Sequence, residues 1–203
     1  IRISSIEASQ ITDEVIEVLR ESDKVVPHLH IPIQSASNTV LKRMRRKYST
    51  EFFAERLERL REVLPDLAIT SDVIVGFPGE TEEEFMETYN FIKDHRFSEL
   101  HVFPYSKRTG TPAARMEDQV DEDVKNDRVH RLISLSEQIA KEYASSYENE
   151  VLEVIPEEPF ENGEDKGLYQ GYSDNYLKVV FPATEDMVGK IVKVKITKAG
   201  YPY

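Results

Sequence analysis

The feature that most constrains the fold is an apolar run that ends in a glycine turn and is followed at once by a helix start. It comprises residues 71–81, SDVIVGFPGET. Glycine allows backbone angles that other residues avoid, proline stiffens the turn, and Thr81 with Glu84 forms a capping-box pattern. A strand, a glycine turn and a helix are typical of the carboxyl edge of an α/β sheet, where ligands bind. The pattern therefore predicts a ligand site at this edge without identifying the ligand.

Short apolar strands alternate with amphipathic helices up to about residue 146. Strands are predicted at residues 1–5, 28–34, 68–75 and 100–105, and Thr12 is the expected cap of the first helix. Because strand–helix alternation requires right-handed crossovers, residues 1–146 are predicted to form an incomplete (β/α) partial barrel, of the TIM type, with about four parallel strands. Four strands cannot close a barrel, so the strand at residues 1–5 is expected to expose an edge.

The remaining residues, 147–203, show a different pattern. After a long predicted helix at residues 122–146, short strands alternate strictly and are separated by turns, among them one expected at Asn162-Gly163. Val192, Val194 and Ile196 share one face of a strand, and Lys193 and Lys195 share the other. This predicts a small antiparallel β-barrel of about five strands. A lysine-bearing face near tyrosines can hold a nucleic-acid backbone and stack a base, although an ordinary solvated face explains the same pattern.

The composition excludes several kinds of protein. The chain has 203 residues, a formal net charge of -12 and no cysteine, which excludes disulfides, thiolate-bound zinc and a cysteine-ligated iron–sulfur cluster within these residues. The acidic balance argues against nucleic-acid binding by bulk charge and leaves only a local patch. No apolar run approaches the roughly 20 residues of a membrane span, so no membrane partner is expected. The chain opens without Met on IRISS, which indicates part of a longer protein.

Two groups of polar residues are open to more than one interpretation. His28 and His30 share a face of their predicted strand and could form a metal pair, but with no obvious third ligand buried histidines are the favoured interpretation. Residues 34–38, QSASN, follow the same strand and can either bind a ribose or carboxylate or cap the next helix through Ser37.

Two further loops also bear on a ligand site. The basic segment at residues 42–48, KRMRRKY, suits a carboxylate or phosphate, or a solvated helix end. Residues 105–113, YSKRTGTPA, follow the fourth predicted strand. Together with the loops after the second and third strands, this loop predicts one shared mouth at the carboxyl edge.

These segments together resemble the methylthiotransferase branch of the radical S-adenosylmethionine (SAM) enzymes. The matching pieces are HIPIQS at residues 30–35, MRRKY at 44–48, the turn at 71–81 and the loop at 105–113. Residues 2–7, RISSIE, and the tail are most similar to the enzymes that methylthiolate threonylcarbamoyladenosine beside the anticodon of tRNA. The tail resembles their TRAM domain, which holds RNA. Ala36 departs from the family, which usually has Gly there.

The resemblance implies a six-stranded partial barrel whose third to sixth strands are the four predicted here. It implies that Val73, Ile74 and the 76–79 turn flank the adenine of SAM, that Gln34 and Ser35 lie near its ribose, and that Glu7 lies near its amino-acid end. Arg45 and Arg46 would then meet the carboxylate of SAM or the RNA. The residues expected to bind SAM are Glu7, Gln34, Ser35, Arg45, Asp72, Val73, Ile74, Gly76, Phe77, Pro78, Gly79 and Tyr105. No residue here is expected to be catalytic or to bind metal. The family's two [4Fe-4S] clusters cannot form on a cysteine-free chain, so this chain alone is expected to be inactive.

The resemblance also implies the partners. They are the anticodon stem-loop of tRNA and the missing amino-terminal part of the same protein. The expected location of the protein is the cytoplasm. The residues expected to contact RNA are Lys178, Lys190, Lys193, Lys195 and Lys198. Isopentenyladenosine in tRNA and an aspartate of a ribosomal protein are alternative substrates, and a non-enzymatic RNA-binding module is an alternative of a different class. A dimer through the exposed strand edge is also possible.

Overall fold

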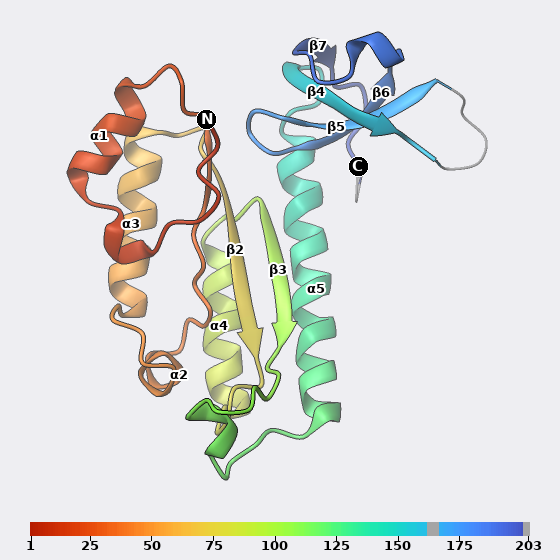
Figure 1. Cartoon of the computed structure of the whole chain (residues 1–203). Helices are drawn as coiled ribbons and strands as arrows, with labels where there is room; N and C mark the ends of the chain where they lie inside the picture. The colour runs from red at the N-terminus through yellow and green to blue at the C-terminus, as the bar shows by residue number, and fades with distance from the viewer. Residues whose placement is uncertain (162–166, 201–203) are drawn as a thin grey trace.

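The parallel sheet expected from the sequence is present in the first part of the chain. The computed structural model describes residues 1–161 and 167–200. Strands β1 (His28–His30), β2 (Ala68–Val75) and β3 (Glu99–Pro104) pair in parallel in the order β1-β2-β3. Figure 1 shows the helices beside this sheet and a second sheet standing at the far end of the long helix α5. The elements of the first part are η1 (Ala8–Gln10), α1 (Asp13–Glu21), α2 (Asn38–Arg43), α3 (Thr50–Val63), α4 (Glu82–Asp94), η2 (Ala113–Arg115) and α5 (Glu122–Ser145).

The two amino-terminal strand predictions were too long. Residues 1–5 contribute a single parallel bridge, from Ile3 to Leu29, although the Ile6 N–H also donates to His30 O at 3.0 Å. β1 ends at His30. Beyond it the Ile31 N–H still donates to Thr70 O at 2.9 Å, and the next bridge joins Gln34 to Val73. Pro32 has no N–H to donate to a ladder, which accounts for the interruption.

The helix signals of the sequence are confirmed at the atomic level. Thr12 caps α1 by accepting the Val15 N–H, and Thr81 and Glu84 form a reciprocal capping box at the start of α4. Ser37 stands at the N-cap of α2, but its hydroxyl makes no cap hydrogen bond. Among the described residues, none of the helices is long and apolar enough to cross a lipid bilayer.

The two faces of the parallel sheet differ in chemistry. Alternate residues of β2, among them Ile69 and Val73, are buried in the core against the helices, together with Phe53, Phe85 and Leu132. The opposite face carries polar side chains, because the period of two turns every second residue the other way. These polar residues are His28, His30, Thr70, Asp72 and His101.

The second part is an antiparallel sheet with the order β6-β5-β4-β7. Its elements are β4 (Val151–Pro159), β5 (Leu168–Ser173), β6 (Lys178–Pro182), η3 (Glu185–Met187) and β7 (Val192–Lys195). Four strands are present among the described residues, against about five predicted; the expected Asn162-Gly163 turn lies outside the described residues. Val192, Val194 and Ile196 pack on the small core of this sheet while Lys193 and Lys195 are exposed, as the alternation predicted.

The two parts touch through Arg2 and Tyr176. Arg2 donates to the backbone oxygens of Ser173 at 3.0 Å and Asp174 at 3.3 Å, and its guanidinium lies 4.7 Å from the centroid of the Tyr176 ring. Tyr176 also stacks on His28, with ring centroids 4.5 Å apart. The second sheet therefore covers the amino-terminal end of the polar face of the first.

Candidate functional site

The carboxyl ends of the three parallel strands surround one cavity of about 640 Å³. One loop from each strand contributes to its wall, as the sequence predicted. Of the residues expected to bind SAM, those that line the cavity are Gln34, Arg45, Asp72, Ile74, Phe77 and Tyr105. The apolar rings of Phe77 and Tyr105 meet edge to face, with centroids 5.3 Å apart, and form one side. The cavity thus combines an apolar wall with a few amide, carboxylate and guanidinium groups, which is typical of small-molecule sites.

Gln34 and Arg45 enter the cavity from strained backbone. Both have positive φ, 63° and 58°, which non-glycine residues seldom adopt. The Gln34 backbone is held by two hydrogen bonds to β2, since its N–H donates to Asp72 O at 2.9 Å and its oxygen accepts the Ile74 N–H at 2.8 Å. Strain held by surrounding hydrogen bonds is common at ligand sites.

The glycine turn at residues 76–79 is held by a buried ion pair. Glu80 Oε1 accepts the Gly76 N–H at 2.8 Å and also accepts from Arg128 Nη1 of α5 at 2.8 Å. Burial raises the pKa of Glu80, while the Gly76 N–H and Arg128 act in the opposite direction. Gly79 donates to Asp118 O at 2.6 Å. The turn is therefore fixed by contacts with Glu80 and Asp118, and its Phe77 ring lines the cavity.

The other residues expected to bind SAM lie behind the cavity wall or beside it. Ser35 is fully buried and its hydroxyl lies 3.2 Å from Thr88 Oγ1 of α4, while Val73 is part of the core. Glu7 accepts from Arg46 Nη1 at 2.8 Å, which places its carboxylate beside a basic residue of the cavity. Gly76, Pro78 and Gly79 shape the turn without lining the cavity.

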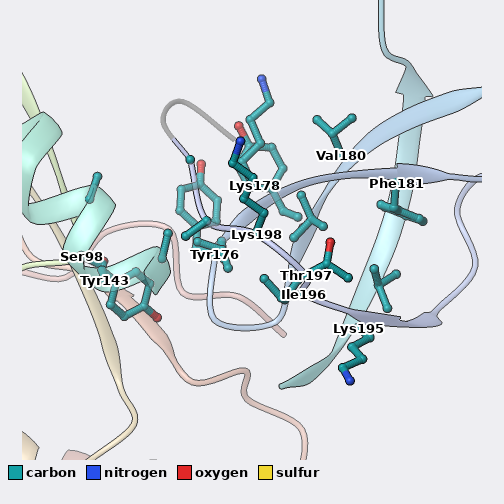
Figure 2. Close-up of a pocket in the computed structure, with 18 of the residues that line it drawn as sticks. Ser98, Tyr143, Tyr176, Lys178, Val180, Phe181, Lys195, Ile196, Thr197 and Lys198 are labelled. Atoms are coloured by element: carbon teal, nitrogen blue, oxygen red, sulfur yellow. The ribbon is translucent and has the colours of Figure 1, made fainter. Parts of the chain in front are cut away.

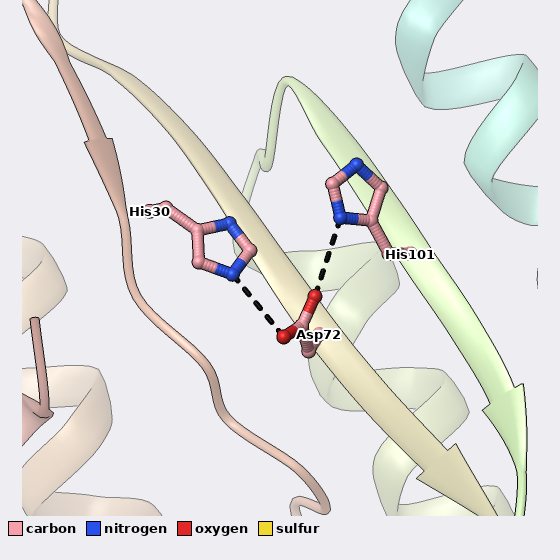
Figure 3. A group of neighbouring side chains, drawn as sticks. All are labelled: His30, Asp72 and His101. Carbon is pink, nitrogen blue, oxygen red and sulfur yellow. Dashed lines mark hydrogen bonds and ion pairs between the residues drawn. The ribbon is translucent and has the colours of Figure 1, made fainter. Parts of the chain in front are cut away.

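Sequence reasoning missed His101. Figure 3 shows that the ring of His101 on β3 and the ring of His30 on β1 both point toward the carboxylate of Asp72, which lies on the strand between them, β2. The only signal in the sequence was the alternation of β3, which puts His101 on the polar face. The predicted His28–His30 pair shares this face, but His28 faces Thr70 and Tyr176 instead.

A second cavity, of about 560 Å³, lies between the two parts of the chain. Figure 2 shows that side chains from the end of α5 and from the second sheet enclose it. Lys178, Lys195 and Lys198 line it; Lys190 and Lys193, also expected to contact RNA, do not. Tyr143, Tyr172 and Tyr176 contribute rings to the same cavity.

The tyrosines of this second cavity are already in contact with the chain itself. Tyr172 stacks on Tyr176 with centroids 4.9 Å apart, and Tyr176 also contacts His28 and Arg2. Burial and a hydrogen bond with Tyr147 raise the pKa of Tyr143. A base that stacked on Tyr176 would have to displace these contacts, so the exposed Lys195 and Lys198 are the more accessible part of this surface.

The chain matches known families in both of its parts. Residues 1–92 match the model of the Radical SAM superfamily, and residues 145–200 match the model of the TRAM domain. Over all 203 residues the chain is 80% identical to the threonylcarbamoyladenosine tRNA methylthiotransferase of Bacillus subtilis, and it spans 45% of that relative's length. Over 98% of its length it is 42% identical to the tRNA-2-methylthio-N(6)-dimethylallyladenosine synthase of Carboxydothermus hydrogenoformans, of which it spans 44%.

A solved structure supports the fold of the first part. The coproporphyrinogen III oxidase of Escherichia coli, a radical SAM enzyme, aligns with a TM-score of 0.56 and 24% identity over 66% of this chain and 31% of its own length. This likeness concerns the fold alone. The two family models, together with the relatives above, show that the chain belongs to the radical SAM proteins that carry a TRAM domain, and it spans less than half the length of those relatives.

Proposed function

We propose that this chain provides the SAM-binding and RNA-binding parts of an enzyme that methylthiolates threonylcarbamoyladenosine beside the anticodon of tRNA. The observation that carries the proposal is the 80% identity over the whole chain to a methylthiotransferase named for that nucleoside. In this proposal residues 1–146, which contain the parallel sheet, bind SAM, and residues 147–203, which contain the antiparallel sheet, bind RNA. As tRNA is the substrate, the enzyme acts in the cytoplasm.

The cavity at the strand ends fits SAM. Ile74 and Phe77 offer an apolar wall for adenine, the Gln34 amide can bond a ribose, and Arg45 can meet the carboxylate. The Tyr105 hydroxyl is buried without a hydrogen-bond partner among the described residues, which leaves a polar atom for a ligand. When bound, SAM would supply the methyl group and the radical chemistry of the family. The protein's own contribution here is to bind and orient it.

The clusters of the family do not fit the residues present. Iron–sulfur clusters are held by cysteine thiolates, and this sequence contains none. We therefore assign no step of the reaction to the chain alone and expect it to bind without catalysing. The cluster ligands belong to the amino-terminal part of the full-length enzyme, which is its partner in the same protein.

The second sheet offers the RNA-binding surface. Lys193 and Lys195 project from the same face of β7 and are exposed, and Lys190 and Lys198 are exposed beside them. Since the whole chain carries a net charge of -12, binding has to be local to such a surface. Changing Lys193 and Lys195 to Ala should weaken tRNA binding and lower its dependence on salt.

The decisive experiment is mass spectrometry of tRNA nucleosides from cells with and without the full-length gene. Selective loss of the 2-methylthio form of threonylcarbamoyladenosine supports the proposal, and its return on complementation with the wild-type gene completes the test. Loss of the 2-methylthio form of isopentenyladenosine instead would show that the enzyme has the activity for which the second relative is named. If no nucleoside changed, a protein substrate or a purely RNA-binding role would replace the proposal.

A variant at the cavity connects the activity to the structure. Ile74→Glu places a charge on the apolar wall, so it should abolish complementation and SAM binding while leaving the fold intact. Ile133→Glu, at a half-exposed position of α5, is the matched control and should complement fully. Full complementation by the Ile74 variant would contradict the placement of adenine.

A further inference from the structure

Register alone brings His30, Asp72 and His101 to one place. Asp72 of β2 pairs directly with His101 of β3, and His30 of β1 pairs with Thr70, two residues before Asp72 on the same face. Side chains two apart on a strand share a face, so all three project from the polar side of the sheet. This juxtaposition arises from three separate strands and depends on no local motif.

The nitrogen and oxygen atoms of the three residues face one another. His30 Nε2 lies 3.3 Å from Asp72 Oδ2, and His101 Nδ1 lies 3.2 Å from Asp72 Oδ1. One such atom from each residue lies within 4.8 Å of the others. Metal–ligand bonds of about 2.0–2.1 Å at tetrahedral angles put neighbouring ligand atoms about 3.3 Å apart, so these separations suit a common ion.

Thr70 orients the first ligand. Its Oγ1 lies 2.9 Å from His30 Nδ1, which leaves His30 Nε2 directed at Asp72. The same oxygen lies 3.1 Å from His28 Nε2 and can accept from both rings. A hydrogen bond to the second ring nitrogen is the usual way in which a protein fixes a metal-binding histidine.

We propose that His30, Asp72 and His101 form a binding site for a divalent transition-metal ion of the zinc type. Two imidazoles and one carboxylate are a ligand set typical of Zn²⁺ and Fe²⁺ sites that keep open coordination positions. The side chains are 13%, 28% and 42% exposed, so the ion has a route from solvent. Asp72 also lines the cavity at the strand ends, and an open position would face a water or an anionic ligand there.

The competing arrangement is a hydrogen-bond network without metal. In it each imidazole donates one N–H to a different oxygen of Asp72, and both contacts are of hydrogen-bond length. The two arrangements differ in protons, because metal binding displaces the hydrogens on His30 Nε2 and His101 Nδ1. Measured zinc binding therefore separates them.

The test uses the 203-residue chain stripped of metal with a chelator and dialysed against Zn²⁺, followed by elemental analysis. Since the sequence has no cysteine, thiolates cannot contribute to the signal. One zinc per chain is expected, together with the visible bands of a low-symmetry site when Co²⁺ replaces zinc. The readout is independent of iron–sulfur clusters and of the methylthiotransferase activity, so it can fail while the proposed function stands.

Variants locate the ion. His30→Gln, Asp72→Asn and His101→Gln should each lower zinc affinity at least about 10-fold, and Thr70→Val should lower it about 10-fold to 100-fold without changing the Co²⁺ ligand set. His130→Gln, at an exposed position of α5, is the matched control and should bind like the wild-type chain. Circular dichroism of each variant establishes that it folds; His101, the most exposed ligand, is the change least able to disturb folding.

Two results would overturn the site. One is a folded wild-type chain that binds no more zinc than the His101 variant. The other is a stoichiometric zinc that persists in the His101 variant and disappears with His130→Gln.

Discussion

The ion pair between Glu80 and Arg128 offers the sharpest test of how the glycine turn is held. The two side chains are only 2% and 4% exposed, and Arg128 Nη1 contacts both Glu80 Oε1 at 2.8 Å and Glu80 O at 3.1 Å. Arg128→Met keeps the length of the side chain and removes its charge and donors. It leaves a buried carboxylate without its counterion, which costs about 3–5 kcal/mol of the free energy of unfolding.

Urea unfolding followed by circular dichroism measures this loss. With a slope of about 1–3 kcal/mol per molar urea, the midpoint should fall by at least about 1 M. Arg59→Met is the matched control, because Arg59 pairs with Glu62 at 3.1 Å while the two side chains are 42% and 66% exposed. An exposed pair contributes at most about 1 kcal/mol, so this variant should stay near the wild type.

The pH dependence and a double variant test the cause. Burial already raises the pKa of Glu80, and loss of Arg128 raises it further, so Glu80 becomes protonated at higher pH in the folded variant than in the unfolded chain. Stability from a raised carboxyl pKa is present at low pH and is lost as pH rises, so the deficit of Arg128→Met should be smaller near pH 4 than near pH 7. Adding Glu80→Gln should restore part of the loss. A deficit below about 1 kcal/mol at neutral pH would refute the argument.

Three further predictions concern other parts of the chain. Burial raises the pKa of Tyr48 to about 12, so up to about 2.7 kcal/mol of the free energy of unfolding is lost as the pH rises from about 10 to 12. Over this pH range the midpoint of urea unfolding should fall less steeply for Tyr48→Phe than for the wild type. Gly76→Ala, with φ +70° and a new Cβ 2.4 Å from Lys125 Cγ, should destabilise more than Gly110→Ala, which has φ +90° and open space. Tyr176→Ala should accelerate amide hydrogen exchange in β1, because the ring packs the second sheet on the first.

The elements with local signals were predicted well from the sequence. Thr12 and Thr81 cap their helices because a hydroxyl followed by free N–H groups is a complete local motif. β2 matches its predicted bounds, and its apolar run ends at the glycine turn. The strand at residues 1–5 was predicted from its apolar pattern, yet its pairing depends on a neighbour, β1, that is itself interrupted before Pro32.

The candidate site was predicted where its residues lie at or just after the carboxyl ends of the strands. Ile74 and Phe77 adjoin the glycine turn, and they line the cavity. The resemblance placed Ser35 near the ribose, but the direction of its side chain depends on Thr88 of α4, which no local pattern reveals. His101 was missed for the same reason, since its relation to Asp72 depends on the register between two strands. Contacts between distant segments are the part of a site that sequence patterns do not specify.

The polar face of the parallel sheet has a gradient of exposure. This gradient explains how one surface can both contact the second sheet and offer groups to a ligand. At its amino-terminal end His28 is 3% exposed beneath Tyr176 of the second part, and burial lowers its pKa to about 4. Toward the cavity the side chains of Asp72 and His101 are 28% and 42% exposed. Because the helices bury the opposite face, only this one can offer polar groups to a ligand. The contact with the second sheet covers one end of this face, so among the described residues its polar groups are more exposed toward the glycine turn and the cavity.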